Sequence, residues 1–134
     1  MRTPVEVVDA WNAAYDARDA EALVALAHED VELVTPGRGT QRGHEAIRES
    51  VRRQTYGVGM HVGTHRRLHR DEHVVTAGTI ELRFVDSGEL AERFEAAAAF
   101  TVRDGRVARM EPHADLASAL AAAGVDQADE VRAA

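Results

Sequence analysis

The first part of the chain carries apolar side chains at helical spacing. Thr3 is a candidate N-cap, and Pro4 suits the first turn of a helix over residues 4–17. The apolar positions of this segment recur every three to four residues, which places them on one helix face: Val7, Val8, Trp11, Ala14 and Tyr15. Asp19 is placed to cap a second helix over residues 20–27. The pattern therefore predicts two helices before the first strand.

The rest of the chain alternates mainly with the period of strands. Residues 31–35 predict a strand that ends at Pro36, and residues 44–54 predict a third helix. After Gly57 four strands are predicted, over residues 60–69, 73–85, 89–103 and 106–114. A last helix over 115–124 follows, capped by Asp115. This order predicts an α+β fold in which N-terminal helices pack on a curved, mostly antiparallel sheet. We expect one domain over residues 1–124 and a C-terminal tail over 125–134.

Strand parity predicts which side chains face the helices. The even positions of the third long strand are mostly apolar and the odd ones include charges, so the even side chains should point inward. The inward rows include Leu90, Phe94, Ala96, Ala98, Phe100 and Val102; Ile80, Leu82 and Phe84; and Ala108, Met110 and Pro112. The small Ala96 and Ala98 stand beside the large Phe94 and Phe100. They leave room either for a ligand cavity or for packing against the helices.

Composition narrows the chemistry. The net charge is −7, from 16 arginines against 23 acidic residues, which argues against a nucleic-acid partner. The chain has no cysteine and no lysine, so disulfides, thiolate chemistry and Schiff bases are excluded. No apolar run reaches the ~20 residues of a membrane span, and the N-terminus lacks the apolar core of a signal peptide. We expect a cytoplasmic protein that binds no membrane.

Four of the seven histidines follow one another at intervals of four residues: His61, His65, His69 and His73. On a helix this spacing would suit a shared metal ion, but on a strand residues four apart are separated by ~13 Å. The neighbouring glycines and the alternation favour a strand, so we expect no metal site. The outer sheet face then carries His61, His65 and His69, which become candidates for a pH-sensitive dimer surface.

Several stretches identify a family resemblance. The strings "AWNAAYDARDAEALVALAHEDVELVTP", "RGHEAIRESV", "VRDGRVARMEPHAD" and "ALAAAG" resemble the SnoaL-like branch of the nuclear transport factor 2-like superfamily, over residues 5–124. The resemblance implies a cone-shaped α+β barrel with a pocket between the concave sheet face and the helices. It also implies a homodimer through the sheet. Because this scaffold hosts cyclases, dehydratases, isomerases, epoxide hydrolases and non-catalytic binders, function must be argued from the site.

The steroid-isomerase branch of this superfamily provides a direct test. Its catalytic tyrosine falls at Trp11, its basic aspartate at Thr35 and its protonated aspartate at Ala98. None of these three side chains can perform the role at its position, because the reaction needs a carboxylate base and acidic hydrogen-bond donors. Ketosteroid-type isomerisation is therefore not expected.

Other side chains remain candidates for acid–base chemistry. Tyr15 lies one turn beyond Trp11 and is either a hydroxyl donor in the cavity or a core tyrosine. Glu92 is either a carboxylate of raised pKa or a solvated strand end. His113 and Asp115 stand where polyketide-cyclase relatives carry polar groups, although Asp115 also fits a helix cap.

Two functions therefore stay open, both without metal or organic cofactor. The first is a cyclase, dehydratase or isomerase acting on a small apolar or aromatic molecule, and the second is a non-catalytic ligand-binding or accessory dimerisation protein. The predicted pocket is formed by Trp11, Tyr15, Leu33, Thr35, Met60, Leu82, Phe84, Phe94, Ala96, Ala98, Phe100 and Met110.

Overall fold

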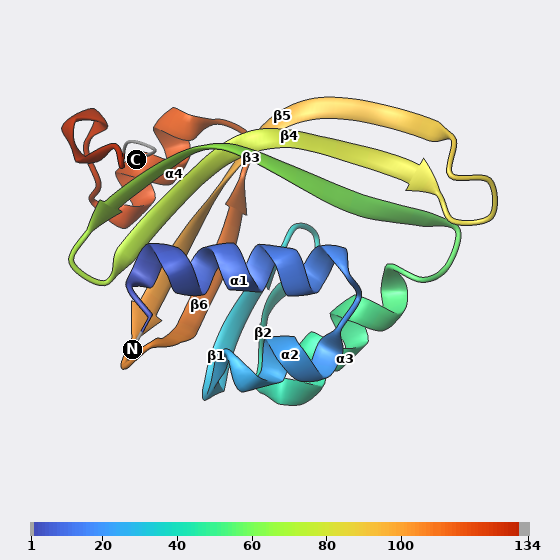
Figure 1. Ribbon diagram of the computed structural model, residues 1–134, viewed down its shortest axis with the longest axis horizontal. Coiled ribbons are helices and arrows are strands. Elements are labelled where there is room, and N and C mark those ends of the chain that lie inside the picture. The colour runs from blue at the N-terminus through green and yellow to red at the C-terminus, as the bar shows by residue number, and fades with distance from the viewer. Residues whose placement is uncertain (1, 132–134) are drawn as a thin grey trace.

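Six strands form one sheet that arches over an N-terminal helix (Figure 1). The computed structural model describes residues 2–131. Its helices are α1 (Pro4–Asp16), α2 (Ala20–Ala25), α3 (His44–Arg53) and α4 (Leu116–Ala123), followed by the short 3-10 helix η1 (Gln127–Asp129). Its strands are β1 (Ala27–Thr35), β2 (Gly39–Arg42), β3 (Val58–Arg70), β4 (His73–Phe84), β5 (Leu90–Arg103) and β6 (Arg106–His113).

The strand order is β2-β1-β6-β5-β4-β3, and only the β1–β6 pair is parallel. The predicted α+β class, with N-terminal helices on a curved and mostly antiparallel sheet, is confirmed. The sheet is not closed, because β2 and β3 form its two edges. The long strands β3, β4 and β5 run on past the C-terminal end of α1 (Figure 1). We call this projecting part of the three strands the arm.

Local signals explain where the helices begin and end. The Thr3 side chain accepts from the Glu6 amide and the Glu6 side chain accepts from the Thr3 amide, which forms a capping box for α1. Asp19 and Asp115 cap α2 and α4 as predicted, and Gly124 ends α4 in the left-handed conformation. One strand was not predicted. Gly37 and Gly39 adopt positive φ, so the glycine-rich segment after β1 folds back and pairs as β2.

Helices cover both faces of the sheet. On the inner face, α1 packs on a core that contains Trp11, Val74, Phe100 and Val107. On the outer face, α4 packs on a smaller core built around Leu68, Val75 and Ala97. Val125, from the segment predicted as a tail, is buried in this second core. No helix among residues 2–131 is both long and apolar enough to span a membrane.

Bulges in three strands change the predicted parity. In β3 the register shifts between Thr64 and Arg66, so Leu68 pairs with Val75 and lies under α4 on the outer face. His69 then pairs with inward Val74, and the expectation that it shares the outer face with His61 and His65 is wrong. Similar shifts place Val107 rather than Ala108 in the inner core and pair Leu90 with Arg83. A bulge inserts one residue, which reverses the alternation beyond it.

Candidate functional site

The inner sheet face divides into a packed part and an open part. In the packed part, Trp11 and Phe100 are each 3% exposed, and Leu33 is buried with them. Ala98 and Met110 pack against the same core. Among the predicted pocket residues, Trp11, Leu33 and Phe100 are therefore buried in the core, and Ala98 and Met110 are half-buried against it.

The open part lies on the arm. Phe84 and Phe94 are 46% and 41% exposed, although both occupy inward positions of their strands. Met60, Leu82 and Ala96 are half-buried beside them in the register of β3, β4 and β5. Thr35 is half-buried at the far end of β1. We call the set Met60, Leu82, Phe84, Phe94 and Ala96 the apolar wall.

Tyr15 joins the helices to the edge of this wall. Its hydroxyl lies 3.1 Å from the Ser50 Oγ of α3, and its ring lies under the guanidinium of Arg18 at 5.8 Å. Arg18 also donates to the Met60 carbonyl at 2.8 Å, while the Met60 amide donates to the Gln54 side chain at 2.7 Å. The half-buried Tyr15 is thus held close to the β3 edge by contacts that link α1, α3 and β3.

The four acid–base candidates do not converge on one place. Glu92 is exposed on the arm, opposite Leu82. His113 pairs with Ala97 on the outer face, and its Nε2 lies 3.0 Å from Glu111 without hydrogen-bonding geometry. Tyr15, by contrast, packs against the inner core. His113 and Asp115 are neighbours, and they lie on the opposite sheet face from Tyr15 and Glu92.

Asp115 acts as a helix cap. Its carboxylate accepts from the Ser118 amide at 2.7 Å, and this hydrogen bond holds the pKa of Asp115 below its usual value. His113 adds a smaller electrostatic contribution in the same direction. A carboxyl group that stays ionised and satisfied at a helix N-terminus is a poor general acid. The geometry therefore favours the structural role that the sequence had left open.

A polar depression on the outer face of the arm was not anticipated. It has a volume of about 830 Å³ and is open to solvent. We call it the polar groove; its lining residues are Asp16, His61, Val62, Gly63, His65, Thr79, Glu81, Arg83, Arg93 and Glu95. Strand alternation could have grouped the residues of β4 and β5. Asp16 of α1 could not have been added, because the contact joins residues 45 positions apart.

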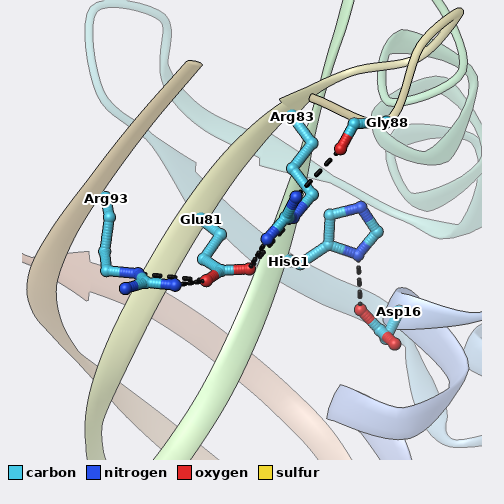
Figure 2. A network of polar contacts seen from close by, with 6 residues as sticks. All are labelled: Asp16, His61, Glu81, Arg83, Gly88 and Arg93. Atoms are coloured by element: carbon cyan, nitrogen blue, oxygen red, sulfur yellow. Dashed lines mark hydrogen bonds and ion pairs between the residues drawn. The ribbon is translucent and has the colours of Figure 1, made fainter. Parts of the chain in front are cut away.

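Two sets of polar contacts organise the groove. Figure 2 shows His61 directed at Asp16, with its Nδ1 2.9 Å from the carboxylate, and Glu81 between Arg83 and Arg93. The hydrogen bond from Arg93, followed by that from Arg83, holds the pKa of Glu81 below its usual value. On the other side, His65 Nε2 lies 2.9 Å from the Thr79 hydroxyl, which donates to Glu95 at 3.0 Å.

Residues 2–131 contain no group of three or more histidine, aspartate or glutamate side chains arranged to hold a metal ion. His61 and His65 share the outer face, but each is engaged by a different partner. The histidine-rich stretch is thus a strand with a bulge, and the helical arrangement that would suit a metal is not formed.

Several solved structures have a similar fold. A candidate polyketide cyclase of Pseudomonas putida KT2440 is 20% identical, with a TM-score of 0.74 over 87% of this chain and 95% of that one. TerC, crystallised with polyporic acid, is 29% identical, with a TM-score of 0.70 over 90% and 98%. An LEH-like epoxide hydrolase of M. tuberculosis is 24% identical, with a TM-score of 0.71 over 90% of this chain and 88% of that one.

No curated protein is significantly similar in sequence. The profile of the SnoaL-like domain family nevertheless matches residues 8–110, from α1 into β6. This match covers the apolar wall, the polar groove and the inner core from Val8 onward. The chain therefore belongs to the SnoaL-like domain family.

Proposed function

We propose that this protein binds a small apolar or aromatic molecule against the apolar wall. The observation that carries the proposal is the exposure of Phe84 and Phe94 on the sheet face that elsewhere forms the core. Large apolar side chains that gather on a surface usually mark a ligand or partner site. TerC, of the same fold, was crystallised with polyporic acid, which supports a ligand of this kind here.

Tyr15 is the polar contact that we propose for this ligand. Its hydroxyl can donate to a ligand oxygen while accepting from Ser50, because a phenol has one proton and acceptor lone pairs. His113 and Asp115 lie on the other sheet face, and Glu92 is solvent-exposed opposite the wall residue Leu82, so binding is the function that the geometry supports best. A cofactor-independent cyclase, dehydratase or isomerase reaction on this scaffold would use Tyr15 as its proton donor. Tyr15→Phe would then abolish turnover and leave binding of an apolar probe intact.

The apolar wall can be tested with the neutral fluorescent probe 1-N-phenylnaphthylamine. We expect saturable binding, weakened about tenfold by Phe94→Ala, because removing a phenyl ring from a contact surface loses roughly 1.5–3 kcal/mol of apolar burial. The measurement is a fluorescence titration at fixed protein concentration, and polyporic acid serves as a competitor.

Tyr56→Ala is the matched control, because Tyr56 is also an exposed aromatic residue but precedes β3 and lies outside the wall. Its affinity should equal that of the wild type. Equal weakening by Tyr56→Ala and Phe94→Ala would show that the probe binds exposed aromatic groups without a site, and would contradict the proposal.

We also propose a homodimer through the sheet, formed at the arm. Val85 and Leu90 are exposed there, and Leu90 opposes Arg83 rather than an apolar-wall residue. A second copy would cover these side chains. Sedimentation equilibrium should show a dimer that Leu90→Glu converts to a monomer, because the substitution places a charge in an apolar contact. A wild-type monomer throughout the micromolar range would overturn this proposal.

A further inference from the structure

Hydrogen bonds determine which ring nitrogen carries the proton in each of the two histidines of the polar groove. The Thr79 hydroxyl has one proton and donates it to Glu95, so it accepts from His65 Nε2. The Asp16 carboxylate can only accept, so His61 Nδ1 is the donor in that contact. A neutral imidazole carries one proton. Both remaining nitrogens, Nδ1 of His65 and Nε2 of His61, therefore carry lone pairs and act as acceptors.

The charges of the groove add to this acceptor character. Its lining contains three carboxylates, Asp16, Glu81 and Glu95, and two guanidinium groups, Arg83 and Arg93. Both guanidinium groups form ion pairs with the Glu81 carboxylate (Figure 2). With neutral histidines the lining has a formal charge of −1, since three negative groups face two positive ones. Glu81 with its two arginines carries +1, and Asp16 and Glu95 carry −1 each beside the two histidines.

Gly63 keeps the space between the two histidines open. A Cβ added at Gly63 would meet only the Thr79 carbonyl oxygen, at 3.8 Å, which is an ordinary contact. By comparison, a Cβ at Gly59 would lie 2.9 Å from Arg18 and Gln54, and one at Gly78 would lie 2.0 Å from a backbone oxygen. Packing therefore requires glycine at positions 59 and 78 but not at 63. A side chain there would project from the outer face, where the groove lies.

From these features we propose that the polar groove is a second binding site, for a small organic cation with several N–H donors, such as a diammonium compound. Two imidazole lone pairs would accept N–H groups, while Asp16 and Glu95 would supply the opposite charge. The groove lies over the outer face at the β3 edge, where Asp16 of α1 completes it, whereas the apolar wall lies on the inner face.

The proposal includes a defined response to pH. The titratable groups that face the groove are Asp16 from α1, His61 and His65 from β3, Glu81 and Arg83 from β4, and Arg93 and Glu95 from β5. Protonation of the two imidazoles turns both acceptors into donors and changes the formal charge of the lining from −1 to +1. Histidines generally change charge between about pH 5 and 8. Binding is therefore present at the upper end of this range and is lost toward the lower end.

The test is a calorimetric titration of the full chain with 1,4-diaminobutane at low ionic strength, with butane-1,4-diol as the neutral analogue. We expect the diamine to bind at least tenfold more tightly than the diol at about pH 8, and this preference to disappear at about pH 5. Glu95→Gln should weaken diamine binding about tenfold, because it removes a charge but keeps the oxygen that accepts from Thr79.

Gly63→Leu should abolish diamine binding, with Gly63→Ala as a milder variant should the leucine protein not fold. Three outcomes would overturn the proposal. The first is absence of diamine binding to the folded wild type at millimolar concentration, and the second is tighter binding of succinate than of the diamine. The third is a Gly63→Leu protein that keeps diamine binding but loses self-association, which would make the groove a subunit surface.

Discussion

Replacing Gly78 with alanine should lower the free energy of unfolding by about 3 kcal/mol, at the upper end of the usual cost of overpacking. The added Cβ would lie 2.0 Å from the Gly63 carbonyl oxygen and 2.9 Å from two further backbone atoms of β3. No side-chain rotation can relieve a contact between two backbones, so β3 and β4 would have to separate beside the β3 bulge. Urea unfolding followed by the fluorescence of Trp11, the only tryptophan, measures the loss.

Gly63→Ala is the matched control for this prediction, because Gly63 lies on the partner strand in the same region of the sheet. Its new Cβ would be 3.8 Å from the Thr79 oxygen, so the free energy of unfolding should change by less than about 0.5 kcal/mol. Similar losses in the two variants would mean that glycine is needed in both strands for a general reason, such as backbone freedom. The close approach at Gly78 would then not be the cause.

Alternation along the chain predicted the sheet well, because strand residues point alternately to two faces. It correctly placed Phe94, Ala98 and Phe100 on one side of β5. It failed beyond the β3 bulge, where Arg66 turns outward to Glu130 and Arg67 turns inward to Asp9 of α1. The sequence "THRRLHR" alternates poorly, with polar side chains on both sides of Leu68, so no hydrophobic period marks the inserted residue.

The candidate site was harder to predict than the fold, since exposure depends on what covers a sheet face. Phe94 and Phe100 have the same residue type and parity, yet only Phe100 is covered by the core of α1. No sequence pattern within β5 indicates where α1 ends on the sheet. The groove has the same origin, because the carboxylate that engages His61 comes from the end of α1. Contacts between distant segments therefore determine which of the predicted residues can meet a ligand.

Phe100→Ala should lower the free energy of unfolding by about 3–5 kcal/mol, whereas Phe94→Ala should change it by less than about 1 kcal/mol. Phe100 is 3% exposed in the inner core, so its removal leaves a cavity between α1 and the sheet. Phe94 is 41% exposed and already meets solvent. Urea unfolding of the two variants measures the difference, with Trp11 fluorescence as the signal.

Stability and probe binding, measured on both phenylalanine variants, distinguish a residue of the core from a residue of the apolar wall. If the apolar wall is the ligand site, Phe94→Ala loses affinity for the fluorescent probe while retaining stability. Phe100→Ala then loses stability but keeps probe affinity in the fraction that remains folded. A Phe94→Ala protein as unstable as Phe100→Ala would show that the arm is packed in solution, most simply by a second copy. The wall would then serve dimerisation rather than ligand binding, because a side chain buried by protein has no surface left for a small molecule.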